Sequence, residues 1–187
     1  VAAPCLPKTL PLAISEGLHL DTAVFAGDAE AGPDARAQVA ALRRAAAQPG
    51  LRWAVINRDA PLSAPIEDAL GSRTARACFS QHPQLPLADC DCWVRATGIS
   101  ATTHGLLVEL ETSAGSGSVE VPLLGRSNVA NLLAVIGVLL STGRDLHSAL
   151  SVTSRLQGVP GRLEPFTAPN SPLVVVDHAD RPRTLLH

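Results

Sequence analysis

The sequence predicts an α/β protein with a mostly parallel sheet, and three observations carry this prediction. Short apolar runs alternate with helix-forming segments over the first 80 residues, which is typical of an open α/β sheet. Two further strand-like segments flank a Ser/Gly-rich stretch at 113–117, which indicates an antiparallel hairpin with a flexible tip. Hydrophobic residues make up 46% of the 187 residues, so a substantial core can form and general disorder is excluded.

The first half of the chain alternates strand and helix. Strands are expected at residues 21–27, 52–57 and 76–80, because compact apolar runs suit parallel strands that are covered on both faces. A helix is expected at 33–48, where Pro49 and Gly50 end it, and a weaker one at 64–70. This order predicts two successive strand–helix–strand units.

The second half begins with the hairpin and ends with two isolated strands. Strands are expected at 92–96, 105–112, 118–124, 163–166 and 173–176. One helix is expected at 128–140 with Gly143 as its C-cap, and a second from Asp145, its N-cap, to about residue 156. The Val-Pro-Gly sequence at 159–161 resembles a hinge, so we expect one domain at 1–158 and the start of another at 159–187.

Charge and hydropathy exclude two classes of partner. Fifteen basic and seventeen acidic residues give a net charge of −2, which argues against electrostatic binding of nucleic acid. The longest apolar run, residues 132–140, is far shorter than the roughly 20 residues that a membrane span needs. Four cysteines are too few for a disulfide scaffold, so we expect a reduced, cytoplasmic protein. Because the chain has no Met, even at position 1, we expect it to be part of a longer one.

Familiar catalytic signatures are missing from the sequence. It contains no GxxxxGK[ST], GxGxxG, GxSxG or HExxH pattern. His82, Cys90 and Cys92 are metal-binding residue types, but structural zinc sites usually separate two cysteines by two to four residues. Cysteines at a strand edge are therefore the better interpretation, and we assign neither a catalytic residue nor a metal ligand.

Two segments carry candidate binding residues. In the first, Gly125 allows a close backbone turn and Arg126 offers a planar fork for phosphate or carboxylate. Asn128 either caps the following helix or faces a ligand, and both interpretations stay open.

The second segment places polar groups around two short strands. Arg162 and Glu164 flank the start of one strand, and Asp177 and His178 end the other. Polar residues at the carboxyl ends of strands bind ligands in many α/β folds. The alternative is a solvated strand end with an Arg–Glu pair that contributes little.

Three ordered motifs resemble the Mur ligase family. They read Gly-Arg-Ser-Asn at 125–128, Val-Pro-Gly-Arg-Leu-Glu at 159–164 and Asp-His-Ala-Asp-Arg-Pro at 177–182. The family has Gly-Arg-Phe-Asn, Val-Pro-Gly-Arg-Met-Glu and Asp-Tyr-Ala-His-Thr-Pro in this order at similar spacing. Segments 17–25 and 52–60 extend the resemblance upstream, and the UDP-N-acetylmuramoyl-tripeptide synthetase branch of peptidoglycan synthesis fits best.

The resemblance implies a fold, cofactors and substrates. The fold is an incomplete Mur ligase central domain, with a mostly parallel sheet, an antiparallel hairpin and helices, followed by the start of a Rossmann-like domain. Family members use ATP and Mg²⁺ to activate a carboxylate of a UDP-muramoyl peptide as an acyl phosphate, which the amine of an amino acid then attacks. By this resemblance Asn128 faces the adenine, Arg162 the nucleotide across the hinge, and Asp177 the ribose or phosphates, with Arg126 as a further nucleotide-binding residue.

The sequence also departs from the family at positions that take part in catalysis in family members. The phosphate loop would lie before Val1, and residues 4–8 read Pro-Cys-Leu-Pro-Lys in place of the magnesium-binding glutamate and its neighbours. The loop at 26–34 lacks the family's Asn, Arg, Asp and His, and the helix at 35–48 lacks the lysine that becomes carbamoylated. In the last motif His178, Asp180 and Arg181 replace Tyr, His and Thr. Because phosphoryl transfer depends on positioned cations, we expect a catalytically incomplete chain.

Three hypotheses follow from these departures. The chain is part of an active ligase, or a degenerate domain that binds a nucleotide or a protein partner, or an unrelated α/β domain. The substituted loops favour the second hypothesis, because truncation does not alter internal residues. We also expect an exposed sheet edge that invites self-association.

Overall fold

The computed structural model of the protein describes residues 19–27, 35–166 and 172–178. Its helices are α2 (Ala35–Ala46), α3 (Ser63–Glu67), α4 (Arg126–Ser141) and α5 (Leu146–Thr153). Its strands are β1 (Thr22–Phe25), β2 (Trp53–Asn57), β3 (Ala75–Ser80), β4 (Cys92–Ala101), β5 (Leu106–Thr112), β6 (Gly115–Val121), β7 (Glu164–Phe166) and β8 (Val174–Val176). No helix among these residues has both the length and the apolar character that a bilayer span requires.

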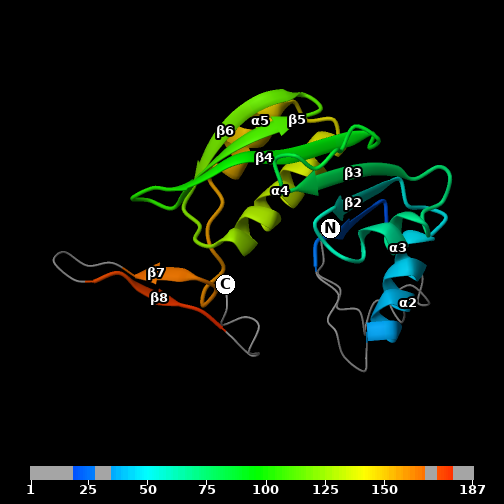
Figure 1. Ribbon diagram of the computed structural model, residues 1–187, viewed down its shortest axis with the longest axis horizontal. Helices are drawn as coiled ribbons and strands as arrows, with labels where there is room; N and C mark the ends of the chain where they lie inside the picture. The colour runs from blue at the N-terminus through cyan, green and yellow to red at the C-terminus, as the bar shows by residue number, and fades with distance from the viewer. Residues whose placement is uncertain (1–18, 28–34, 167–171, 179–187) are drawn as a thin grey trace.

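The first six strands form one sheet in the order β1-β2-β3-β4-β5-β6 (Figure 1). Strands β1 to β4 are parallel neighbours, and β4, β5 and β6 run antiparallel to one another. Helix α2 connects β1 to β2, and α3 connects β2 to β3. The predicted α/β class, with a mostly parallel sheet and an antiparallel hairpin, is confirmed.

The hairpin turn is tighter than the sequence suggested. Thr112 pairs with Gly115, so Ser113 and Ala114 alone connect β5 to β6. The Thr112 hydroxyl donates to the Gly115 carbonyl (2.8 Å) and accepts from the Ala114 N–H (3.1 Å). The prediction of a flexible tip over 113–117 is therefore wrong, because residues 115–117 belong to β6. A Cβ at Gly117 would lie 2.7 Å from Leu150, so glycine here lets α5 approach the sheet.

Helix α4 covers one face of the sheet (Figure 1). Its apolar side buries Leu132, Leu133 and Ile136 against Val55, Phe79, Val94 and other inward-facing strand residues. A Cβ at Gly137 would lie 3.3 Å from Val55, which shows how closely the helix approaches β2. Helix α5 packs beside α4 and against β6.

Helices α2 and α3 cover the opposite face over β1 and β2. There Ala45, Ala46 and Ile66 are buried with Ala54 and Ile56 of β2. The inward-facing residues of β2 thus alternate between two cores, as expected for a parallel strand covered on both faces.

The predicted helix ends near α4 and α5 are mostly confirmed. Gly143 adopts a left-handed φ of 86° and its N–H donates to the Leu140 carbonyl, as expected for a residue that ends a helix. The Asp145 side chain accepts from the Ser148 N–H (2.9 Å), so it caps α5. Helix α4 begins at Arg126, two residues before the predicted start.

Strands β7 and β8 form a separate antiparallel ribbon that projects from the main sheet (Figure 1). Leu173 and Val174 expose more than half of their surface, and Phe166 exposes 51%. Both predicted strands are present, at 164–166 and 174–176.

Candidate functional site

The first part of the site is the start of α4. Gly125 holds the N-cap position with a φ of 81°, and no side chain caps this helix end. Asn128 is the third helical residue, so the interpretation that it caps the helix is wrong. Its side-chain amide instead donates to the Leu124 carbonyl (2.8 Å), and its Oδ1 accepts from Asn131 (3.4 Å). These bonds fix the orientation of the Asn128 amide.

The second part is the segment that follows α5. Gly161 and Leu163 both adopt left-handed backbone angles, with φ of 70° and 47°. The Glu164 carboxylate accepts from the Gly161 N–H (2.8 Å), which stabilises the bend. A Cβ at Gly125 would overlap with the Leu163 side chain. Glycine at 125 therefore permits the close approach of the two segments.

A pocket of about 220 Å³ lies between these two segments. Leu123, Leu124 and Pro165 give it apolar walls, and Asn128, Arg162 and Glu164 are among its polar lining residues. The structure thus brings Asn128 and Arg162, which are far apart in the sequence, to one cavity.

Asp177 and Arg126 lie beside this pocket rather than in its lining. The Asp177 carboxylate accepts from the Leu163 N–H (3.1 Å), and Arg162 donates to the His178 carbonyl (2.9 Å). These two bonds tie the end of β8 to the pocket segment. Arg126 and Asp177 are both exposed, and neither lines the cavity.

A polar group centred on Asp59, a residue with no predicted role, lies at the carboxyl ends of β2 and β3. The Asp59 carboxylate accepts from the Ser80 hydroxyl (2.5 Å) and from the Gln81 N–H (2.7 Å). His82 Nε2 lies 4.0 Å from the same carboxylate. The signal was present in the sequence, because Ser80 ends one predicted strand, Gln81 and His82 follow it, and Asp59 lies two residues after another.

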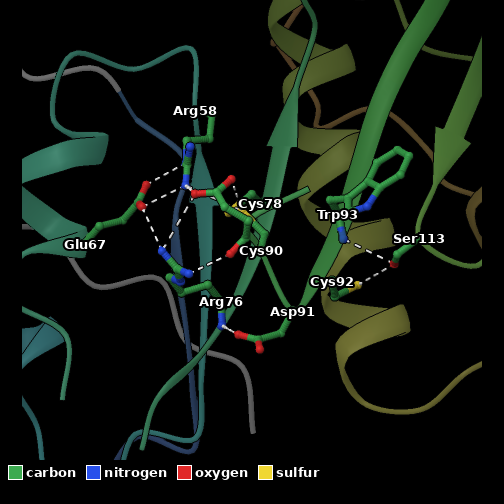
Figure 2. Close-up of a disulfide and its surroundings, with 10 residues drawn as sticks. Arg58, Glu67, Arg76, Cys78, Cys90, Asp91, Cys92, Trp93 and Ser113 are labelled. Atoms are coloured by element: carbon green, nitrogen blue, oxygen red, sulfur yellow. Dashed lines mark hydrogen bonds and ion pairs between the residues drawn. A yellow bond between two sulfur atoms is a disulfide. The ribbon is translucent and has the colours of Figure 1, made fainter. Parts of the chain in front are cut away.

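The cysteines differ from the sequence-based expectation. Cys78 and Cys90 form a disulfide (Figure 2). The expectation that the cysteines are reduced is therefore wrong for these two, and so is the interpretation of Cys90 as an ordinary strand-edge cysteine. The reason is the path of residues 81–91, which cross the face of β3 and return Cys90 to within 6.1 Å of Cys78, measured between Cα atoms. Cys92 is a buried free thiol. Among the described residues no three His, Cys, Asp or Glu side chains are grouped to hold a metal ion.

A cluster of charges surrounds this disulfide (Figure 2). Arg58 pairs with Glu67 (2.6 Å) and with Asp89 (2.7 Å), and Arg76 lies 3.5 Å from Glu67. The hydrogen bond from Arg58 holds the pKa of the Asp89 carboxyl below its usual range. Burial lowers the pKa of Arg58, but its bond to Asp89 and the charge of Glu67 outweigh burial and raise it.

A larger cavity of about 450 Å³ lies near this cluster, at the amino end of β3. Glu67, Arg73, Arg76 and Asp91 are among its lining residues. Ligands of open α/β sheets bind beyond the carboxyl ends of the strands. We therefore assign the candidate site to the smaller cavity, which also holds two of the predicted residues.

Comparison with known proteins gives the class of this chain. The family model described as Mur ligase middle domain matches residues 37–139. The match covers more than half of the chain, which therefore belongs to the Mur ligase family.

Two relatives show to which kind of Mur ligase this chain is similar. The chain is 40% identical over 139 residues to a UDP-N-acetylmuramoyl-L-alanyl-D-glutamate–2,6-diaminopimelate ligase from Alkalilimnicola ehrlichii, covering 73% of this chain and 26% of the relative. It is 34% identical over 174 residues to the ligase of the same name from Janthinobacterium sp. (strain Marseille), covering 90% of this chain and 34% of the relative. The chain thus spans about a third or less of these relatives.

Solved structures agree on the fold. A structure of a UDP-N-acetylmuramoyl-L-alanyl-D-glutamate–2,6-diaminopimelate ligase has a TM-score of 0.76 at 25% identity, covering 97% of this chain and 37% of that one. A D-alanyl-D-alanyl-adding ligase from Acinetobacter baumannii has a TM-score of 0.68 at 22% identity, covering 89% of this chain and 35% of that one, which shows the fold alone.

Most departures from the family's catalytic motifs fall outside the described residues. Residues 4–8, 28–34, Asp180 and Arg181 lie there. Helix α2 is described, and it carries Arg43 and Arg44 but no lysine.

Proposed function

We propose that this chain forms the nucleotide-facing part of a ligase that uses ATP to add an amino acid to a UDP-muramoyl peptide. We also propose that the chain by itself is catalytically incomplete. Membership of the Mur ligase family and the names of the relatives support the reaction class. The division into a central domain at 1–158 and the start of a second domain at 159–187 is part of this proposal.

The observation that carries the proposal is the pocket that Asn128 and Arg162 share. Its volume, about 220 Å³, lies below the range of about 300–1,000 Å³ for pockets of drug-sized ligands, so it suits part of a nucleotide, such as the base. Leu123, Leu124 and Pro165 supply the apolar walls that a flat heterocycle needs.

The Asn128 amide retains the free hydrogen-bonding groups that recognition of adenine requires. An asparagine side chain has two N–H donors and an oxygen with two lone pairs. The Leu124 carbonyl uses one donor and Asn131 uses one lone pair, which leaves one donor and one acceptor side by side. This pair matches the acceptor and donor on an adenine edge. Asn128 is therefore the proposed base-recognition residue.

The other three predicted residues are proposed to act on the rest of the nucleotide. Arg162 uses one N–H on His178 and retains further donors for phosphate oxygens. Asp177 is exposed beside Leu163 and offers a carboxylate oxygen to a ribose hydroxyl. Arg126, exposed at the start of α4, offers a second planar guanidinium group to phosphate oxygens.

Catalytic incompleteness is proposed because the residues of this chain do not fit the chemistry. Residues 4–8 read Pro-Cys-Leu-Pro-Lys in place of the family's magnesium-binding glutamate, so no step is routed through Mg²⁺. The described α2 has no lysine to become carbamoylated. Phosphoryl transfer needs such positioned charges, so their loss removes the reaction rather than slowing it.

The second candidate is a non-catalytic domain that binds a protein partner or a second copy. The observation that favours it is the outer edge of β1. Within the described part of the chain β1 pairs only with β2, and Val24 on this strand exposes 48% of its surface. An unpaired edge strand offers backbone donors and acceptors to another chain.

The first test is nucleotide binding by calorimetry, with ATP in the presence and absence of Mg²⁺. Asn128→Ala is expected to weaken binding about tenfold, the effect of losing about 1.4 kcal/mol of hydrogen bonding. Ser127→Ala is the matched control, because it is an exposed neighbour on the same helix turn that does not line the pocket. Equal affinity of Asn128→Ala and the unsubstituted protein, or no binding by either, would count against the proposed pocket.

Phosphate release separates the two parts of the proposal. With ATP, Mg²⁺, a UDP-muramoyl dipeptide and an amino acid, we expect no phosphate release above the uncatalysed rate. Any turnover that depends on the dipeptide would show that the chain is catalytically complete. Sedimentation of the same sample measures self-association, and a monomer at all concentrations would argue against pairing through β1.

A further inference from the structure

We propose that the Cys78–Cys90 disulfide is a redox-responsive clamp that holds residues 81–91, the crossover segment, on the sheet. We further propose that Cys90 is the reactive thiol of the pair once the bond is reduced. This inference is independent of nucleotide binding. It rests on the path of the segment, its few apolar contacts, the charges around Cys90 and the burial of Cys78.

The crossover segment joins two neighbouring parallel strands without a helix. Helices α2 and α3 connect the preceding strand pairs, whereas residues 81–91 contain no helix between β3 and β4. Its backbone makes two turn hydrogen bonds, from the Leu85 N–H to the His82 carbonyl and from the Cys90 N–H to the Leu87 carbonyl. The segment therefore lacks the long apolar stripe by which a helix packs on a sheet.

Few apolar side chains hold the crossover segment in place. Its buried cluster consists of Cys78, Leu87 and Cys90, with Leu85 and Trp93 packed against it. Two of the three buried residues are thus the bonded cysteines themselves. Without the bond, Leu87 would be the main apolar anchor.

The remaining contacts of the crossover segment are polar. Arg58 binds the Asp89 carboxylate, Arg76 donates to the Asp89 carbonyl (2.6 Å), and Arg95 donates to the Leu85 carbonyl (3.2 Å). The Asp89 side chain is 55% exposed, so solvent competes for its ion pairs. These mostly exposed contacts contribute little to holding the segment on the sheet, so the covalent bond is its main restraint.

The two sulfur atoms differ in their surroundings. Cys90 Sγ lies 3.6 Å from Arg58 Nη2, and a nearby guanidinium stabilises a thiolate. Cys78 lies within β3 and is 1% exposed, and Cys90 is also buried, at 9%, but it lies at the end of the crossover segment between two exposed aspartates. The Asp89 carboxylate, 3.8 Å from Cys90 Sγ, opposes the thiolate, but its charge is paired with Arg58. Cys90 is therefore expected to ionise and react first when both cysteines are reduced.

The redox step balances with an external dithiol. A reductant such as dithiothreitol attacks through one thiolate and breaks the S–S bond, and its second thiol resolves the mixed disulfide. Cys78 and Cys90 each gain one hydrogen, and the reductant becomes a cyclic disulfide. Oxidised dithiothreitol reverses the reaction through the Cys90 thiolate.

Release of the crossover segment would also affect the polar group around Asp59 at the carboxyl end of β3. The segment begins at Gln81, whose N–H donates to Asp59, next to the bond from Ser80 to the same carboxylate. Reduction is thus expected to loosen the Asp59 group as well as to expose Leu85 and Leu87. The hairpin of β5 and β6 has no contact with this bond and should not respond.

The test is hydrogen exchange of the full chain followed by mass spectrometry, with the oxidised and the dithiothreitol-reduced protein. We expect exchange of amides in 82–90 to rise by about tenfold or more on reduction, because local opening no longer has to break a covalent link. Exchange in β5 and β6 should stay the same. Cys90→Ser should match the reduced protein with or without reductant, and Cys92→Ser should respond to reductant as the unsubstituted protein does.

Two results would overturn the clamp. One is the absence of a Cys78–Cys90 linked peptide after digestion of the native, unreduced protein. The other is equal exchange of 82–90 in the oxidised and reduced states.

Alkylation tests the proposal that Cys90 is the reactive thiol. In the reduced protein iodoacetamide should modify Cys90 before Cys78 and Cys92, and Arg58→Gln should slow the modification of Cys90 severalfold. Equal rates at the three cysteines would refute the assignment of Cys90.

Discussion

The two faces of the sheet are held by different kinds of interaction. On one face, α4 buries Leu132, Leu133 and Ile136 against the strands, with no ion pair among these contacts. On the other face, over β3 and β4, the crossover segment has a single buried cluster and depends on arginines and a disulfide (Figure 2). The α4 face is stabilised by area removed from water. On the opposite face, α2 and α3 bury an apolar cluster over β1 and β2, and only the part over β3 and β4 depends on a few directional bonds.

This difference predicts how each face fails. Apolar burial is spread over many atoms and depends much less on pH, ionic strength and redox conditions than ion pairs or a disulfide do. Ion pairs weaken with added salt and with protonation of the carboxylate, and a disulfide depends on redox conditions. A change of conditions can therefore loosen the crossover segment while the α4 face stays intact. The packing of α4 on the sheet should therefore persist under conditions that release the crossover segment.

Truncation of the α4 face should have the largest effect. Leu133 is fully buried, so Leu133→Ala leaves a cavity and should lower the free energy of unfolding by about 2–5 kcal/mol. Urea unfolding followed by circular dichroism measures this loss. Val135→Ala on the same helix is the control, because Val135 is 36% exposed and its truncation should change stability by less than about 0.5 kcal/mol. Similar losses for both variants would contradict the described packing of α4.

Loss of Arg58 should have an intermediate effect. Arg58→Gln leaves the Glu67 carboxylate, 15% exposed, with only Arg76 at 3.5 Å, and should lower the free energy of unfolding by about 1.5–3 kcal/mol. Arg52→Gln is the control, because Arg52 and Asp21 are 76% and 64% exposed and such a pair is worth about 0–1 kcal/mol. Urea unfolding at low and high salt measures both, and equal losses would show that the Arg58 cluster is no more than a surface ion pair.

Most of the sheet could be predicted from the sequence because its elements are marked by local patterns. The apolar runs of β1, β2 and β3 and the Asp145 cap are readable from adjacent residues. The extent of β6 could not be predicted in this way, because its first residues are Gly115, Ser116 and Gly117. These have low strand propensity, and their place in the strand depends on pairing with β5 and on Leu150 packing over Gly117.

The site could be predicted only in part, for a similar reason. The motifs around Asn128 and Arg162 resemble a family, and the structure brings both residues to one pocket. The disulfide could not be predicted, because the spacing of Cys78 and Cys90 says nothing about the path of the chain between them. A crossover without a helix has no periodic pattern, and it is the tertiary return of residues 81–91 that brings the sulfurs together.

The smallest expected effect concerns Cys92, the buried free thiol on the α4 face. Burial raises the pKa of this thiol, the charge of Asp91 raises it further, and the hydrogen bond from Ser113 partly offsets them. A raised pKa in the folded state means that folding retains a proton that the unfolded chain loses. The associated stability is therefore fully present below the unfolded thiol pKa of about 8.5 and is lost as pH rises through the folded value.

The chain is well suited to measuring this effect, because it has no Tyr and Lys8 is its only lysine. The free energy of unfolding of the oxidised protein should fall as pH rises from about 8 to 10. Cys92→Ala should start lower, because it leaves a small cavity, but should show a flatter decline over the same range. Parallel declines for the two proteins would mean that Cys92 ionises equally in the folded and unfolded states, and that the apolar face does not exclude its charge.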